Sequence, residues 1–497
     1  MILLFNPRAT NHNPRIPNSV LQIAASIDGI YEWVIVDGNL EKDPWTVIEN
    51  YLSTGKIKYF GCTVMPGPQL KQAITFTKKI RASYPHIKII FGGYFASNQY
   101  KVNLDSGYVD YIVNGPGDNT FPQLINAIEN NLQVDGIKNL IYKKDEQIFK
   151  TAKEELLDLD KLPALPYQKL NKFYPFQKLL PKTYLGKKTI AYHSSFGCPF
   201  TCSFCAVVPI YNARWKGKSA QGIYNDVKLL KDTYQADSIE FHDNNFFVSE
   251  KRTVEFAKLI EKENMVWWGE ARIDTMDKYK DESLAAIRKS GCKMIFFGAE
   301  TGNDEVLEKM DKGGTQTGKQ ILEFAERLKK FDIIPEYSFV LGIPGDTEKQ
   351  VNKQIDEDIA FIKKVKAINP KTEIIIYTYS PVPTEGSDMY KQVLDSGFKF
   401  PETLEDWISP AWENFDLRKN PLTPWLKPHM IDKIKQFETV LNGYYPSNSD
   451  IRLTAPKKII LKTLSSWRYK SSLYSFPKEI SFLQRVWKYR QPETEGF

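Results

Sequence analysis

The sequence predicts an α/β protein with two parallel sheets and a C-terminal cap. Short apolar runs alternate with helical stretches over residues 1–140 and again over residues 186–400, which is the pattern of parallel strands covered by helices. With 497 residues, the chain is also too long for one hydrophobic core. We therefore expect a doubly wound, Rossmann-like domain at 1–140, a linker at 141–185, a partial (β/α)6 barrel at 186–400 and the cap at 401–497.

Composition and charge argue against several other classes of protein. Hydrophobic residues make up 42% and charged residues 26%, which is ordinary for a soluble globular protein. Five cysteines argue against a secreted disulfide scaffold, and no segment approaches the roughly 18 consecutive apolar residues of a spanning helix. Residues 1–7 lack a basic region and are expected to form a strand rather than a signal peptide, so we expect a cytoplasmic protein. A net charge of +7 is too mild and too dispersed for a nucleic-acid-binding protein.

The first sheet is predicted from five strand-like runs with helical stretches between them. The strands are expected at 2–6, 33–36, 59–64, 87–91 and 111–113. The helices are expected at 19–27, 45–53, 69–83 and 121–130. Ligands of such sheets bind beyond the carboxyl ends of the strands.

Glycine-rich loops follow four of these strands. They are Asp37-Gly38-Asn39, Thr63-Val64-Met65-Pro66-Gly67-Pro68, Gly92-Gly93-Tyr94 and the loop 114–118, which contains Gly115. Glycine lets a large ligand approach the backbone closely. Any single loop is explained by an ordinary strand-to-helix turn, but four such loops on one edge of a sheet favour a bound ligand.

The second sheet is predicted from six further β/α units. The strands are expected at 189–193, 238–242, 266–268, 294–298, 337–341 and 373–379. The helices are expected at 220–233, 250–264, 280–290, 318–330 and 348–366. Six such units predict a complete or partial barrel with its chemistry at the carboxyl ends of the strands.

Three of the five cysteines follow the first barrel strand. Cys198, Cys202 and Cys205 have the spacing Cys-x3-Cys-x2-Cys, and thiolates grouped so closely suit a metal or an iron–sulfur cluster. Three ligands leave one corner of a four-iron cube open, which favours a catalytic cluster that binds a substrate or cofactor. A structural zinc site is the alternative; it needs a fourth ligand, for which His193 and His242 are candidates, although hydrogen-bonding roles are commoner at strand ends.

The cysteine motif, with Phe204 directly before the third cysteine, resembles the signature of radical SAM enzymes. The resemblance implies a [4Fe–4S] cluster whose open iron binds S-adenosylmethionine (SAM) and cleaves it to a 5′-deoxyadenosyl radical. Segments at other strand ends also resemble motifs of the radical SAM barrel, and this resemblance implies further contacts. The SAM contacts that it implies are Phe204, Asp243, Arg272, Glu300 and Gly342.

Each implied SAM contact has an expected role. Asp243 would bind the methionine ammonium or a substrate, Arg272 would face a carboxylate, and Glu300, in a Gly-Ala-Glu segment, would contact a hydroxyl or amine. Gly342 would belong to a backbone platform for adenine. Salt bridges or helix caps at the rim are the alternative for the charged residues. The loop 380–386 departs from the family's proline-rich motif and receives no role.

The first domain resembles the cobalamin-binding domain of B12 proteins. Thr63-Val64-Met65 stands at its Ser-x-Leu segment and Gly92-Gly93 at its paired glycines, but its Asp-x-His-x-x-Gly motif keeps Asp37 and has Asn39 at the histidine. An amide is a poor cobalt ligand, so we expect cobalamin that is not ligated by a histidine of this protein. A degenerate domain without cobalamin is the alternative. The implied cobalamin contacts are Asn39, Thr63, Val64, Met65, Gly92, Gly93, Tyr94 and Gly115.

The whole chain resembles the B12-binding-domain radical SAM enzymes, many of which are methyltransferases. The resemblance implies methylation of an unactivated carbon, in which one SAM methylates cob(I)alamin and a second forms the radical. Two alternatives stay open: an oxidative cyclase or rearrangement enzyme without methyl transfer, and a non-catalytic electron-transfer protein that binds a cluster and a corrinoid. The expected partners are a small-molecule or lipid-like substrate and an electron donor such as flavodoxin or ferredoxin.

The C-terminal part, 401–497, is expected to form an irregular, aromatic-rich cap over the barrel mouth. The stretch 457–475 combines aliphatic residues with lysine and arginine. Such a stretch can lie on an anionic membrane surface, or it can form a helix packed on the protein with its lysines in solvent, which is the interpretation that we prefer from the sequence.

Overall fold

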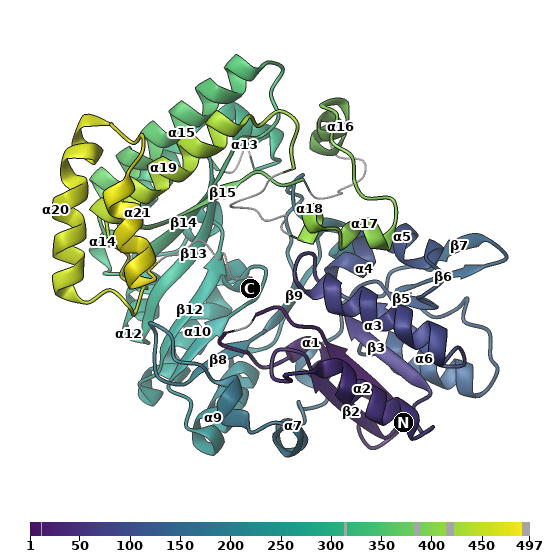
Figure 1. Ribbon diagram of the computed structural model, residues 1–497. Helices are drawn as coiled ribbons and strands as arrows, with labels where there is room; N and C mark the ends of the chain where they lie inside the picture. Colours follow the sequence, from purple (N-terminus) through teal and green to yellow (C-terminus); the bar gives the residue numbers. More distant parts are fainter. Residues whose placement is uncertain (11, 313–315, 382–387, 414–421, 490–497) are drawn as a thin grey trace.

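The computed structural model describes residues 1–10, 12–312, 316–381, 388–413 and 422–489. Two sheets lie beside each other, a mostly parallel one in the purple and blue N-terminal part and a parallel one in the teal and green central part (Figure 1). Within the described ranges, no helix is both long enough and apolar enough to cross a membrane. The predicted α/β architecture is confirmed.

The first sheet has the strand order β2-β1-β3-β4-β5-β6-β7, and its first five strands are parallel. The chain adds β2 on one side of β1 and β3 on the other, so the ends of β1 and β3 form a switch point at which ligands of such sheets bind. The strands are β1 (Ile2–Asn6), β2 (Trp33–Asp37), β3 (Tyr59–Thr63), β4 (Lys88–Gly92), β5 (Tyr111–Val113), β6 (Leu140–Lys144) and β7 (Gln147–Lys150).

This sheet extends beyond the predicted boundary at residue 140. Residues 141–150, which we assigned to the linker, form the hairpin of β6 and β7 together with Leu140, and β6 pairs with β5 in antiparallel register, Val113 opposite Leu140. The hairpin belongs to the sheet because Leu140 and Ile141 are fully buried in it. The linker begins after Lys150, and it contains the helix α7 (Tyr167–Phe173).

Alternate residues of β1 enter separate cores on the two faces of the sheet. Ile2 and Leu4 pack in the core that contains residues of α1 (Asn18–Ile27) and α6 (Thr120–Glu129). Leu3 and Phe5 pack in the core that contains residues of α2 (Pro44–Ser53) and α3 (Gln69–Ser83). The first of these cores continues into the barrel, so the two halves of the molecule share buried surface.

The second sheet is parallel throughout and follows the chain order β8-β11-β12-β13-β14-β15. Among the described residues its end strands, β8 and β15, do not pair with each other, so it forms a partial barrel. The strands are β8 (Thr189–Tyr192), β11 (Ser238–Phe241), β12 (Val266–Ala271), β13 (Cys292–Glu300), β14 (Ile334–Leu341) and β15 (Glu373–Thr378). The main helices between them are α9 (Ala220–Tyr234), α10 (Glu250–Ile260), α12 (Asp281–Lys289), α14 (Gly318–Lys330) and α15 (Glu348–Ile368).

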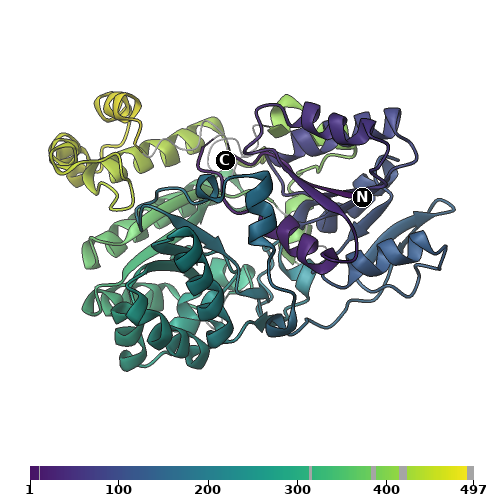
Figure 2. The ribbon, with the colours of Figure 1, turned by 90° about the horizontal axis from the view of Figure 1, so that it is seen from below.

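The expectation of an irregular C-terminal cap is wrong for most of the described residues, because they are helical. The helix α17 (Leu404–Trp407) packs on the first domain, where the rings of Trp407 and Phe95 lie 5.1 Å apart. The helix α19 (Pro428–Tyr444) packs on α15, and α20 (Ala455–Ser471) and α21 (Lys478–Trp487) pack on α19 (Figures 1 and 2). The C-terminal part therefore contacts both halves of the molecule.

Candidate active site

The three cysteines lie in a loop framed by the antiparallel pair β9 (Ser195–Gly197) and β10 (Trp215–Gly217). Gly197 has φ +74°, and a Cβ atom there would overlap the Arg214 carbonyl, so the frame requires glycine. At the other end of the loop, the Ser203 amide donates to the Met310 carbonyl and the Ser203 hydroxyl to the Lys309 carbonyl. The loop is thus fixed to the barrel on both sides.

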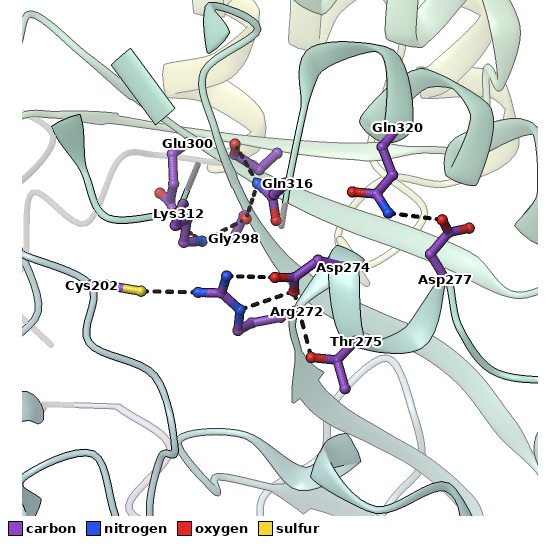
Figure 3. Close-up of polar contacts among 11 residues, drawn as sticks. Cys202, Arg272, Asp274, Thr275, Asp277, Gly298, Glu300, Lys312, Gln316 and Gln320 are labelled. Carbon is purple, nitrogen blue, oxygen red and sulfur yellow. Dashed lines mark hydrogen bonds and ion pairs between the residues drawn. The ribbon is translucent and has the colours of Figure 1, made fainter. Parts of the chain in front are cut away.

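Arg272 joins this loop to the end of β12. Its Nη1 donates to Cys202 Sγ at 2.9 Å, and its guanidinium forms two hydrogen bonds to the Asp274 carboxylate, at 3.0 and 2.7 Å (Figure 3). Burial works against the charge, but Asp274 and the thiols hold the pKa of Arg272 above its ordinary value. The carboxylate that Arg272 faces is therefore supplied by the chain itself.

Glu300 ends β13 in the left-handed region, with φ +64°, at a shift of register against β14. Its Oε1 accepts from Lys312 Nζ at 2.6 Å, and both side chains are buried (Figure 3). Lys312 also donates to the Gly298 carbonyl at 2.8 Å, and its Nζ lies 5.9 Å from the centre of the Phe204 ring. One oxygen of the predicted SAM contact Glu300 is therefore already paired.

Asp243 has a structural position at the start of the cysteine loop, and its expected contact with the methionine ammonium or a substrate stays a prediction. Its side chain is fully buried, and its Oδ1 accepts from the Ser194 amide, the Ser194 hydroxyl and the Ser195 hydroxyl. Arg252 donates to the Ser194 carbonyl from the other side, at 3.1 Å. Asp243 therefore fixes the turn that leads from β8 into the cysteine loop.

Residues of the C-terminal part also contact Gly342. Its carbonyl accepts from the Trp425 indole at 2.9 Å, and a Cβ atom at its φ of +79° would lie 2.5 Å from a methyl group of Leu426. Glycine is required there because the C-terminal part packs on the end of β14. The adenine platform at Gly342 stays a prediction, and residues 382–387 of the proline-rich loop lie outside the described residues.

A cavity of about 690 Å³ lies between the strand ends of the two sheets. Its barrel side includes His193, Ser195, His242 and Asn244, and residues 162–165 of the linker also line it. The predicted cobalamin contacts that line it are Asn39, Thr63, Met65, Gly92, Gly93, Tyr94 and Gly115. Val64 does not line the cavity, because its side chain is fully buried and its backbone pairs with Gly92 and Phe95.

The short helix α4 (Tyr94–Asn98) connects the glycine loop to the cysteine loop. It starts after Gly93, which has a φ of +89°. A Cβ atom at this position would lie 2.7 Å from the Val64 carbonyl oxygen, so only glycine fits there. Tyr94 Oη donates to Asn244 Oδ1 at 2.8 Å, and Asn98 Nδ2 donates to the Ala206 carbonyl at 3.1 Å. This helix, which the sequence did not predict, joins the two halves beside the cavity.

Asn39 stabilises the loop in which B12 proteins have their histidine. Its Nδ2 donates to Asp37 Oδ1, and its Oδ1 accepts from the amides of Ala9 and Thr10. Burial raises the pKa of Asp37 to about 6. Both polar atoms of the Asn39 side chain are therefore hydrogen-bonded within the first domain, although the residue lines the cavity.

Residues 192–357 match the family model described as the radical SAM superfamily. The chain carries a radical SAM domain. An uncharacterized methyltransferase of Pyrococcus horikoshii is 24% identical to it over 70% of this chain and 73% of its own length. The anaerobic magnesium-protoporphyrin IX monomethyl ester cyclase of Rubrivivax gelatinosus is 24% identical over 80% of this chain and 67% of its own length.

A solved structure has the same fold over nearly the whole chain. It is the radical SAM methyltransferase TsrM from Kitasatospora setae with cobalamin and a [4Fe–4S] cluster bound. The two chains are 16% identical, the similarity covers 98% of each, and the TM-score is 0.66. The radical SAM match therefore lies in the barrel, and the chain has an additional α/β domain before it.

The cysteine loop of the radical SAM domain fits a [4Fe–4S] cluster. Burial raises the pKa of the Cys198 thiol and raises that of Cys205 to about 12, whereas the positive charges of Arg272 and Lys312 favour the thiolates. In the described part of the chain, no three His, Cys, Asp or Glu side chains surround a single point as ligands of one metal ion do. The ligands of a four-iron cube lie at separate corners and need no such arrangement.

The two histidines considered as zinc ligands lie in the cavity wall of the radical SAM domain. Their ring centres are 6.0 Å apart, and His242 Nε2 lies 3.3 Å from Glu240 Oε2. The His193 ring lines the cavity and is surrounded by protein. This burial lowers the pKa of His193 to about 3, so the imidazole stays neutral. Sequence reasoning placed these histidines at strand ends but did not assign them to the cavity.

The sequence did not indicate Asp274, Lys312 or Gln316 as site residues. Gln316 donates to the carbonyls of Gly298 and Ala299 and so supports the strand end that carries Glu300. The one usable signal was the Arg-x-Asp spacing of Arg272 and Asp274. Lys312 and Gln316 follow the strand by more than ten residues, in a segment without a recognisable pattern.

Proposed function

We propose that this protein is a cobalamin-dependent radical SAM methyltransferase that acts on an unactivated carbon of a small molecule. The observation that carries the proposal is the shared cavity, which is lined both by the glycine loops of the first domain and by the strand ends beside the cysteine loop. A substrate between two cofactors needs such a space, because reaction depends on holding the reacting groups together.

The cysteines are proposed to hold the cluster, and the residues around them to adjust it. When bound, the cluster supplies an electron that cleaves SAM to a 5′-deoxyadenosyl radical. Arg272 and Lys312 offset the negative charge of the thiolates, and Asp274 keeps the Arg272 guanidinium pointed at Cys202. Phe204 packs beside Lys312 at the edge of the loop. An external one-electron donor of the flavodoxin or ferredoxin type completes the proposal.

The first domain is proposed to hold cobalamin, which would supply the methyl group. Gly92, Gly93 and Gly115 leave backbone open to the cavity, and Thr63 and Asn39 add polar atoms to its wall. The loop with Asn39 has no histidine to offer the cobalt, and both cavity histidines belong to the barrel. The bound corrinoid of the TsrM structure, which has the same fold, supports this assignment.

Anaerobic reconstitution with iron, sulfide, cobalamin and SAM tests the proposal. The visible spectrum reports cluster and corrinoid together, and reduction with dithionite should release 5′-deoxyadenosine. Cys202→Ala should lose the cluster and the 5′-deoxyadenosine while keeping the corrinoid. A protein that binds the cluster but never retains cobalamin would contradict the proposal.

A cyclase or rearrangement activity without methyl transfer is the second candidate. The similarity to the Rubrivivax gelatinosus cyclase, which extends over 80% of this chain, favours it. Product mass distinguishes the two activities, since methyl transfer adds one methylene to the substrate. A cyclisation removes hydrogen or adds oxygen instead.

A further inference from the structure

The helix α20 has two faces of different character. Leu461, Ser465 and Tyr469 are buried, and they pack toward α19, where a Cβ atom on Gly443 would lie 3.0 Å from Ser465 Cβ. This packing fixes the orientation of the helix. The residues on its remaining surface are therefore held out from the protein.

That remaining surface is apolar to an unusual degree. Ile459 is 67% exposed and Trp467 54% exposed, and Ile460 and Leu464 are exposed beside them. The following loop and α21 also expose Leu473, Phe476, Phe482 and Val486, of which Phe476 is 70% exposed. Single exposed apolar residues are common, but eight within two adjacent helices and their loop mark an interaction surface.

The same segment is strongly basic. Residues 455–489 contain eight lysine and arginine residues and one glutamate, a net charge of +7, which equals the net charge of the whole chain. The one glutamate, Glu479, is paired with Arg468 inside the segment. The helices α20 and α21 lie at the edge of the molecule in both ribbon views (Figures 1 and 2), which leaves this surface open to a partner.

We propose that the α20–α21 surface docks on an anionic lipid bilayer. Helices that lie in a membrane interface combine a basic flank with exposed Trp, Phe, Leu and Ile, as this segment does. A second copy of the chain would bring the same positive charge to the contact, and a nucleic acid would leave the aliphatic side chains uncovered. The bilayer is the partner that matches both the charge and the apolar groups.

Co-sedimentation of the full chain with vesicles tests this proposal. Binding is expected with phosphatidylcholine vesicles that contain phosphatidylglycerol and not with phosphatidylcholine alone, and it should weaken as salt rises. Replacing Lys457, Lys458 and Lys462 by glutamate should weaken binding about tenfold or more, because each basic residue near an anionic surface contributes. The variant Phe482→Ser with Val486→Ser should also weaken it while keeping the parental thermal stability.

Matched variants on other surfaces separate this surface from a general charge or hydrophobic effect. The set Lys144→Glu, Lys161→Glu and Lys187→Glu makes the same charge change elsewhere, and Ile30→Ser removes a 66% exposed apolar residue from the first domain. These controls should bind like the parent. Equal losses in controls and test variants, no binding of the parent to anionic vesicles, or reversible self-association through this surface in place of vesicle binding would overturn the proposal.

Discussion

At the scale of single residues, the charge around the cysteine loop decides what the site can do. Arg272 contacts Cys202 directly, and Asp274 fixes its guanidinium in a geometry that Lys could not reproduce with two parallel hydrogen bonds. Phe200 covers the guanidinium at 3.9 Å, so little water screens the charge. A positive charge so close to a cysteine ligand favours the more negative, reduced form of a bound cluster.

Removing that charge should make the cluster harder to reduce. In Arg272→Met, we expect the midpoint potential of the reconstituted cluster to fall by on the order of 50–100 mV, since the reduced cluster loses a nearby positive charge. A potentiometric titration followed by electron paramagnetic resonance measures it, with iron content as the check that the cluster is intact. Arg272→Lys should lie between parent and variant, and identical potentials in all three proteins would count against the role given to Arg272.

The carboxylate of Asp358 should make stability depend on pH. It is buried on α15, accepts from the Thr301 hydroxyl and the Gly302 amide, and burial raises its pKa to about 7. The folded state therefore keeps a proton that the unfolded chain releases above about pH 4, so stability falls as pH rises from about 4 to about 7. Asp358→Asn should remove about 2–4 kcal/mol of this fall.

Denaturant unfolding of parent and variant at a series of pH values checks this prediction. The comparison isolates Asp358 from other buried carboxylates, such as Asp118, that titrate in the same range. Parallel stability curves for the two proteins would show that Asp358 does not carry the effect.

At the scale of elements, the strands and long helices follow from local pattern. The segment β5 and the helices α3 and α14 have the predicted ends, because buried apolar runs or amphipathic stretches stand between clear turn residues. The short helix α4 could not be predicted, since five residues carry no period and its position depends on Gly93. The helix α20 agrees with the interpretation of 457–475 as a helix packed on the protein, but its apolar residues lie on the exposed face as well as the buried one.

The glycine that starts α4 should be essential for the first domain's side of the cavity. Gly93→Ala places a Cβ atom 2.7 Å from the Val64 carbonyl at a φ of +89°, so the loop must move. We expect cobalamin retention to fall at least tenfold while the cluster is kept, measured by the corrinoid and iron content of anaerobically purified protein.

Gly67→Ala is the matched control for this substitution. Gly67 also has a positive φ, +95°, but nothing lies within 4 Å of its Cβ position and it does not line the cavity. It should share the backbone strain and keep the corrinoid. If both variants retained cobalamin equally, the glycine loop would not be part of the cobalamin site.

At the scale of the whole molecule, the site arises from docking two sheets that are far apart in the sequence. Asn18 donates to the Ala191 carbonyl at 2.8 Å across 173 residues, and Tyr94 donates to Asn244 across 150. The sequence predicts both sheets and the edges that carry their ligands. It does not predict the hydrogen bonds that Asp243 forms with Ser194, Glu300 with Lys312 and Gly342 with Trp425. These partners come from distant segments or from segments without a recognisable pattern.

The central proposal is that a cluster on the cysteine loop and a cobalamin in the adjoining cavity lie close together between the two sheets. The most direct test is electron paramagnetic resonance of the reconstituted, reduced protein that holds both the paramagnetic cluster and cob(II)alamin. We predict broadened or split signals that become simple when Cys202→Ala removes the cluster, because the two spins interact across the cavity. Sharp, independent signals from a protein that holds both groups would place them at separate sites and contradict the account.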